Sequence, residues 1–166
     1  MRKLILDTET TGLDYQKDRI IELACLEIVD NEYTERKFHR YYNSDGVAIS
    51  AQSAEIHGLS NSFLRKFNSF DDSLDEFIDF VGDAQLVIHN AQFDISMINN
   101  ALKRKNRSEI AMDSVLCTLE MAKKKFPGSK NNLNALCRRF NISLESREKH
   151  GALTDCFLLL RVFIEL

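Results

Sequence analysis

Two carboxylates stand two residues apart at the end of the first apolar segment. Asp7 and Glu9 follow Leu4–Leu6 and belong to the run Asp-Thr-Glu-Thr-Thr-Gly. Side chains at positions i and i+2 of a strand point to the same side, so both carboxylates can face one spot beyond a sheet. Carboxylates this close repel each other unless a proton or a cation offsets the repulsion, and hard oxygen ligands favour Mg²⁺ or Mn²⁺. Taken alone, however, a solvated turn explains this pair better.

Two further carboxylates stand where helices are expected to begin. Asp94 closes the run His-Asn-Ala-Gln-Phe-Asp, and Asp155 closes the run His-Gly-Ala-Leu-Thr-Asp that starts at His150. Aspartate is favoured in the first turn of a helix. Taken alone, each of these two residues is therefore explained by a capping role. His150 and Asp155 are too far apart to share a helical face. We therefore expect His150 to precede the helix, in a charged loop.

The spacing of apolar residues along the sequence indicates the strands and helices that must position these side chains. Short apolar segments separated by polar ones predict three antiparallel strands, at Leu4–Leu6, Ile20–Val29 and Phe38–Tyr42. Further along, a buried strand is expected at Gln85–His89. Helical spacing and end signals predict helices after Ser73 and over Asp94–Lys105, Val115–Phe126, Leu133–Phe140 and Thr154–Leu166. Strands followed by helices that alternate with strands predict a mixed sheet covered by helices, an α/β fold.

Composition narrows the class of protein. The 166 residues fit one domain over 1–166, and the net charge of −3 argues against a protein that coats nucleic acid through bulk charge. A nucleic-acid enzyme remains open, because metal ions can offset clustered carboxylates. No apolar run approaches the roughly 20 residues of a membrane span, and the apolar N-terminal stretch is too short for a signal peptide. We expect buried free thiols, no structural zinc and a cytoplasmic location from the unpaired spacing of Cys25, Cys117, Cys137 and Cys156.

Taken together, the carboxylate motifs resemble those of the DEDDh exonuclease superfamily, in its proofreading branch. Asp7 and Glu9 match the first motif, Asp94 the second, and His150 with Asp155 the third. The resemblance covers nearly the whole chain. It implies a ribonuclease H-like fold, a mixed five-stranded sheet flanked by helices, and a single 3′→5′ exonuclease catalytic domain.

The segments between the motifs strengthen this resemblance. Ile56–Leu59 is similar to the superfamily's substrate-contacting segment, and Phe126–Gly128 and Asn132–Cys137 are similar to segments of bacterial DNA polymerase III epsilon subunits. Such subunits usually carry an acidic residue five positions before the histidine of the first segment. Here that position holds Gln52, whose amide can still hydrogen-bond a terminal sugar.

The resemblance implies phosphodiester hydrolysis with two Mg²⁺ or Mn²⁺ ions, roughly 3.5–4 Å apart. By this analogy Asp7 bridges the ions, Glu9 and Asp155 complete the first ion's site, and Asp94 acts near the second. His150 is the general base, and a histidine suits this role because its unperturbed pKa is about 6.5. The product is a 5′-nucleoside monophosphate released from a 3′ end.

The same resemblance implies a substrate-binding set and partners. His57 is expected to contact the terminal nucleotide, and the backbone around Thr10 to hold its 3′ hydroxyl. The full expected set is Asp7, Glu9, Thr10, Gln52, His57 and Asp155. The expected partners are single-stranded or frayed DNA 3′ ends and the polymerase III alpha subunit, although the C-terminal segment with which epsilon subunits usually dock is not within this sequence.

Two other functions stay open. A DEDDh ribonuclease that trims RNA 3′ ends would carry the same five catalytic residues, although Phe126–Gly128 and Asn132–Cys137 favour DNA. A catalytically silent nucleic-acid-binding subunit is disfavoured, because all five catalytic residue types are present.

Overall fold

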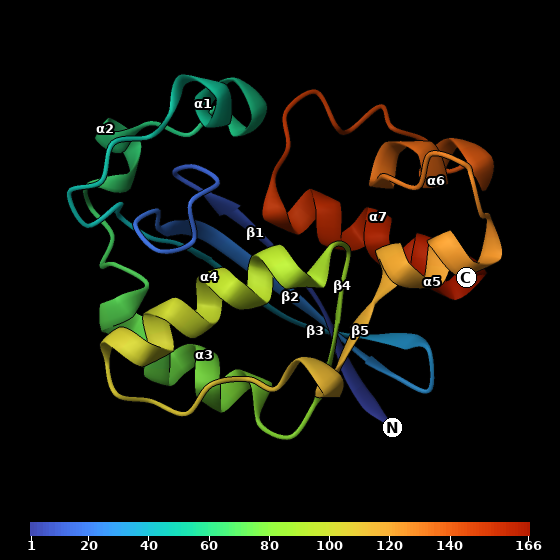
Figure 1. Cartoon of the computed structure of the whole chain (residues 1–166), viewed down its shortest axis with the longest axis horizontal. Coiled ribbons are helices and arrows are strands. Elements are labelled where there is room, and N and C mark those ends of the chain that lie inside the picture. The colour runs from blue at the N-terminus through green and yellow to red at the C-terminus, as the bar shows by residue number, and fades with distance from the viewer.

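The centre of the molecule is a mixed five-stranded sheet, described over residues 1–166 by a computed structural model (Figure 1). The strand order is β3-β2-β1-β4-β5. The first three strands are antiparallel, whereas β4 and β5 run parallel to β1. The strands are β1 (Arg2–Thr10), β2 (Ile20–Val29), β3 (Glu32–Tyr41), β4 (Gln85–Ile88) and β5 (Val115–Cys117).

Helices cover both faces of this sheet. They are α1 (Ala51–His57), α2 (Asn61–Leu64), α3 (Leu74–Val81), α4 (Ala91–Arg104), α5 (Thr118–Lys125), α6 (Leu133–Arg139) and α7 (Ala152–Glu165), with short 3₁₀ turns at Asp71–Ser73 and Met112–Ser114. No helix has the length and apolar character needed to cross a membrane. The expected mixed sheet flanked by helices is therefore confirmed.

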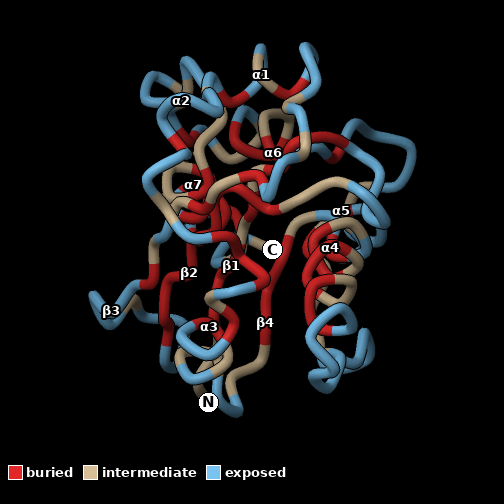
Figure 2. The backbone as a smooth tube through the Cα atoms, turned by 90° about the vertical axis from the view of Figure 1, so that its left-hand side faces the viewer, coloured by how far each residue is buried: buried red, intermediate tan, exposed pale blue.

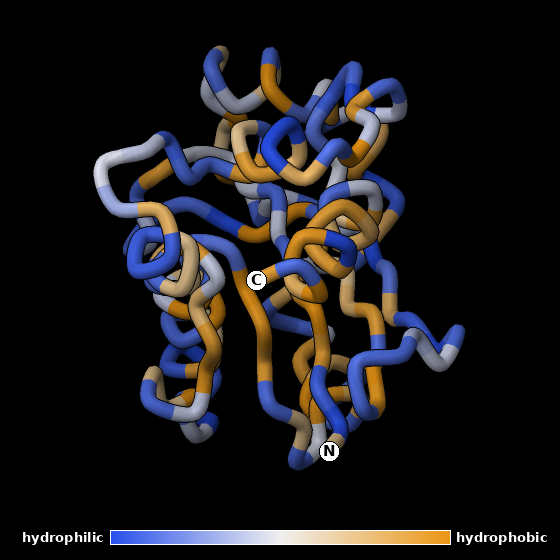
Figure 3. Tube along the Cα trace, turned by 90° about the vertical axis from the view of Figure 1, so that its right-hand side faces the viewer, coloured by the Kyte–Doolittle hydropathy of each residue, from blue (hydrophilic) through white to orange (hydrophobic).

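Alternate residues of β1 enter two separate cores, because successive side chains of a strand point to opposite faces. Leu6 packs with Phe77 of α3 and with the inner side of α4. Ile5, on the other face, packs with Leu159 of α7 and with α6. Buried residues follow β1, β2 and β4 and the inner sides of the helices (Figure 2). The strands at the centre of the molecule are largely hydrophobic (Figure 3). The central strand is thus fixed from both sides.

The expected helix over Val115–Phe126 is wrong at its start. Val115–Cys117 forms β5, which pairs in parallel with Leu86–Ile88, and the helix begins only at Thr118. Leu116 and Leu119 fit helical spacing, but pairing with a strand far away in the sequence decides the conformation. All four cysteines are free as expected, although Cys117 is only half-buried.

The first strand is longer than its apolar segment. β1 pairs with β2 from Arg2 to Thr10, but it pairs with β4 only over Lys3–Ile5. Beyond Ile5 the sheet therefore opens, and the carboxyl half of β1 has a strand on one side only. The amino ends of α4 and α7 flank this opening, which contains the candidate site.

Candidate active site

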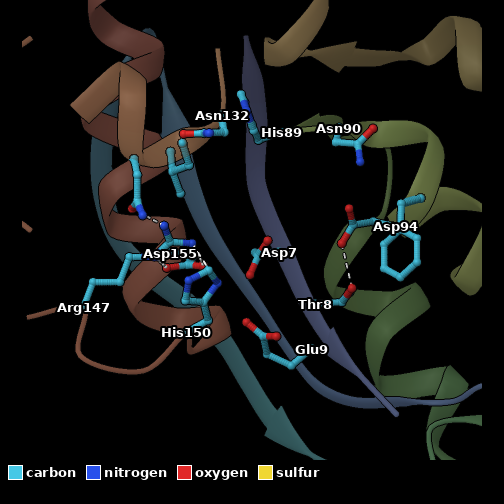
Figure 4. Close-up of a pocket in the computed structure, with 13 residues that line it drawn as sticks. Asp7, Thr8, Glu9, His89, Asn90, Asp94, Asn132, Arg147, His150 and Asp155 are labelled. Atoms are coloured by element: carbon cyan, nitrogen blue, oxygen red, sulfur yellow. Dashed lines mark hydrogen bonds and ion pairs between the residues drawn. The ribbon is translucent and has the colours of Figure 1, made fainter. Parts of the chain in front are cut away.

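All five residues expected to be catalytic line one cavity of about 410 Å³. Asp7 and Glu9 come from β1, Asp94 from the first turn of α4, Asp155 from the first turn of α7, and His150 from the loop before α7. Figure 4 shows these side chains converging from opposite walls of the cavity. The lining also includes asparagines, Thr8, Phe93, His89 and Arg147, and only two of the thirteen lining residues are hydrophobic.

The two carboxylates of β1 are strongly disfavoured as a pair of charges. Asp7 Oδ2 is buried and has no hydrogen-bond partner. Burial raises the pKa of Asp7 well above its ordinary value, and the charges of Asp94, Glu9 and Asp155 raise it further. Burial, with the neighbouring Asp155 and Glu22, likewise raises the pKa of Glu9 to about 8. Protons therefore offset the repulsion in the absence of another cation.

Asp94 is held on the opposite wall. Its side chain is almost fully buried, and Thr8 Oγ1 donates a hydrogen bond of 2.6 Å to its Oδ1. Burial raises the pKa of Asp94 to about 7, and the Thr8 hydrogen bond opposes this rise. Asn90, the N-cap of α4, adopts a left-handed backbone with φ 64°, which asparagine tolerates better than most residues. This tight entry turn directs Asp94 into the cavity.

Asp155 and His150 share one partner, Arg147. The guanidinium donates from Nε to Asp155 Oδ1 and from Nη2 to Asp155 Oδ2, both at 2.7 Å. Nη2 also lies 3.1 Å from His150 Nδ1, and Nη1 donates to Asn134 Oδ1. Burial and the Arg147 charge lower the pKa of His150, against the opposing effect of Asp155. His150 is therefore a neutral imidazole near pH 7.

The donor set fits a divalent cation. Candidate ligand atoms of Glu9, His150 and Asp155 all lie within 4.8 Å of one another. Asp7 adds a buried carboxylate oxygen without a partner beside them. An oxygen-rich cavity with this excess of negative charge suits Mg²⁺ or Mn²⁺ better than soft metals.

The remaining substrate residues expected from the sequence lie outside the cavity lining. His57 is buried at the end of α1, where it accepts a hydrogen bond of 3.0 Å from the Leu59 N–H through Nδ1. Its Nε2 lies 3.1 Å from the Thr10 carbonyl oxygen, and the hydroxyl of Thr10 donates to Gly12 O. Gln52 is exposed on α1. His57 therefore holds the backbone at the end of β1, while Gln52 remains free.

The sequence did not reveal two supporting residues. Arg147 stands in a charged run that resembles a solvated loop, yet its side chain is only 7% exposed. Glu22 interrupts the apolar Ile20–Val29 segment, and its Oε1 accepts the Ala152 N–H at 2.8 Å while its Oε2 lies 2.6 Å from His39 Nε2. An acidic residue within an apolar strand was the available signal for Glu22, although Glu27 in the same strand gives the same signal. Glu22 ties the start of α7 to the sheet.

Fold and site together define a metal-dependent exonuclease. A family model described as exonuclease (RNase_T) matches residues 4–163, and the chain belongs to this family. Among its curated relatives is the DNA polymerase III subunit epsilon of Rickettsia felis, 44% identical over all of this chain and 74% of the relative. The subunit of Salmonella typhimurium is 37% identical over 98% of this chain and 70% of the relative. Within the family, the chain thus belongs with the epsilon subunits.

Solved structures of exonucleases have a similar fold. Exonuclease X in complex with 5′ overhanging duplex DNA is 26% identical, with a TM-score of 0.73 over 99% of this chain and 89% of that one. E. coli exonuclease I in complex with a dT13 oligonucleotide has a TM-score of 0.82 over 98% of this chain and 40% of that one. At 15% identity, the second likeness supports the fold alone.

Proposed function

We propose that residues 1–166 form a single catalytic domain that removes nucleotides from DNA 3′ ends as the proofreading subunit of a replicative DNA polymerase III. The observation that carries this proposal is the convergence of Asp7, Glu9, Asp94, His150 and Asp155 in one cavity. The chain's similarity to epsilon subunits, at 36–44% identity, supports DNA as the substrate and the polymerase alpha subunit as the partner.

Each catalytic residue has a proposed task. Asp7, Glu9 and Asp155 would hold two Mg²⁺ or Mn²⁺ ions, with Asp94 close to the second. Bound ions supply the positive charge that stabilises the attacking and leaving oxygens of the phosphodiester. His150 accepts the proton of the attacking water, and its lowered pKa keeps it neutral and able to do so near pH 7.

The terminal nucleotide is proposed to enter between the end of β1 and α1. His57 contributes by fixing the Thr10 carbonyl, so that the backbone of residues 8–11 can receive the 3′ hydroxyl. Gln52, exposed on the same helix, is available to hydrogen-bond the sugar. Mismatched ends are preferred because they fray at lower cost than paired ends. We propose that this work takes place in the cytoplasm, which the free thiols fit.

The proposal is tested with 5′-labelled primers that end in a matched or a mismatched nucleotide, and with an RNA of the same sequence. We expect 5′-monophosphate release in Mg²⁺ or Mn²⁺ and none in EDTA, with the mismatched end degraded faster. His150→Ala should lower the rate by about 10²–10⁴, the usual contribution of a general base, and Asp7→Ala should lower it at least as far because it removes a metal ligand. Glu32→Ala, an exposed change on β3, is the control.

Two results would contradict the proposal in different ways. Clear preference for RNA would replace proofreading with RNA trimming and leave the chemistry intact. Full activity of the Asp7→Ala protein would refute the assignment of the site itself. Binding of the alpha subunit is measured separately, by co-purification of the two chains.

A further inference from the structure

The acidic cavity already contains one internal cation. Arg147 is the only lysine or arginine among the residues that line it. Its guanidinium contacts both oxygens of Asp155, Asn134 Oδ1 and His150 Nδ1. The side chain is 7% exposed, so this contact is buried rather than a surface ion pair. A buried bidentate pair of this kind is geometrically well defined.

Arg147 acts electrostatically as a cation bound in the cavity would. It lines the same cavity as Asp7, Glu9 and Asp94, so its positive charge lies among their carboxylates. It therefore offsets part of the repulsion among the carboxylates when nothing else does.

The same contact conflicts with the proposed role of Asp155. Both carboxylate oxygens of Asp155 accept hydrogen bonds from the guanidinium in its best, bidentate geometry. A metal ion at Asp155 needs at least one of these oxygens, and it would lie close to the positive charge of Arg147. Each oxygen keeps a second lone pair, so a metal ion can still reach Asp155, but it would have to do so against the nearby positive charge of Arg147.

His150 is affected in a similar way. Arginine has donors and no acceptor, so the contact at Nδ1 uses the lone pair of that ring nitrogen. In a neutral imidazole the proton is then on Nε2, which leaves neither nitrogen free to accept a proton from water. His150 cannot act as a base while this contact persists.

We propose that Arg147 is an internal counter-cation that weakens metal binding at Asp155, and that it must release His150 before catalysis. The inference rests on the proposed metal-dependent function and adds the residue that sets its metal affinity. The loop carrying Arg147 is held on α1, because the His150 N–H donates to Ile56 O at 2.9 Å and Lys149 Nζ donates to Glu55 O at 2.8 Å. Because the loop is held in place, we expect Arg147 to leave its partners by rotation of its side chain alone. Asn134, which it already contacts, is a neutral partner that it can keep.

The first test is Mn²⁺ affinity, measured by calorimetry on the metal-free full chain. Arg147→Met should bind Mn²⁺ about tenfold or more tightly than the wild type, a factor equivalent to about 1.4 kcal/mol of lost competition. The metal-free variant should also melt at a lower temperature, because Asp155 loses its partner. Arg138→Met removes an exposed arginine of α6 and is the matched control, with unchanged affinity expected. Unchanged or weaker Mn²⁺ binding by Arg147→Met would overturn the proposal, since Arg147 would then support Asp155 as a ligand.

A second measurement uses the wild type and does not depend on the variant folding. In protein labelled with ¹⁵N-arginine, the Nε–H of Arg147 should give a signal protected from exchange in EDTA, and Mg²⁺ should shift it. A signal that stays unchanged at saturating Mg²⁺ would overturn the inference while leaving the proposed function intact. If the wild type neither binds Mn²⁺ nor cleaves DNA, the proposed function fails first.

Discussion

The metal-free protein should lose stability as the pH rises from about 6.5 to 8. Burial and neighbouring carboxylates raise the pKa of Glu9 from 4.5 to about 8 in the folded chain. Between these values the folded state binds a proton that the unfolded state has released. Because the folded state binds more protons, the free energy of unfolding falls as pH rises, and the contribution of Glu9 is lost as the pH passes through about 8.

The size of the effect follows from this one proton. Each pH unit across which the folded state holds one extra proton costs about 1.4 kcal/mol, so 1.5 units cost roughly 2 kcal/mol. For a chain of this length that is a fall of about 4–8 °C in the midpoint of thermal unfolding. Asp94, whose pKa is raised to about 7, adds to the fall in the lower half of the range. The histidines with lowered pKa values, His57, His89 and His150, act mainly below pH 6.5 and leave this window clear.

The assay is thermal unfolding in EDTA at several pH values, for wild type, Glu9→Gln and Glu32→Gln. The exposed Glu32→Gln control should follow the wild type. Glu9→Gln should show a much smaller slope and exceed the wild type in stability at pH 8. Adding Mg²⁺ should raise the wild-type midpoint more at pH 8 than at pH 6.5, because the ion competes with protons for the carboxylates. A wild-type midpoint that is flat or rises with pH in EDTA would refute the reasoning.

Three further changes test the supports of the site. Thr8→Val removes the donor to Asp94 and should cost about 1.5–3 kcal/mol in urea unfolding at pH 8, above the pKa of about 7, as expected for a hydrogen bond to a charged group; a cost near zero would contradict this support of Asp94. Glu22→Ala leaves the Ala152 N–H at the start of α7 unpaired and should cost about 1–3 kcal/mol in the same assay, with faster amide exchange there. Phe77→Ala empties a fully buried position and should cost about 3–5 kcal/mol while metal-dependent cleavage at low temperature persists; lost cleavage by folded protein would contradict the separation of that core from the site.

The sequence carries the four candidate carboxylates as local signals. The spacing of Asp7 and Glu9 requires only the geometry of a strand, and Asp94 and Asp155 stand at helix starts that periodicity finds. Their convergence depends on the opening of the sheet beyond Ile5, which is a property of strand pairing rather than of any local segment. Arg147 was not found for a related reason, since its burial is created by residues from α6 and α7.

Elements with a long hydrophobic pattern were predictable from the sequence. Elements whose conformation depends on pairing with a distant strand were less so. Ile20–Val29 was predicted with its observed bounds, because apolar residues, most of them β-formers, fill eight of its ten positions. The polar end of β1 and the three residues of β5 become strands only through their neighbours, β2 and β4. α1 and α2 are short and largely exposed, so they lack the apolar stripe that predicts a helix.

The tie between Glu22 and the Ala152 N–H also orders the appearance of activity during synthesis. These two residues are 130 positions apart, and a ribosome adding about 5–20 residues per second needs roughly 6–26 s to pass from one to the other. Throughout this interval the nascent chain carries Asp7 and Glu9 but lacks Asp155, and His150 is added only at its end. If the proposed site assignment holds, an incomplete chain is inert as a nuclease, and the capacity to cut DNA arises when α7 docks on the sheet.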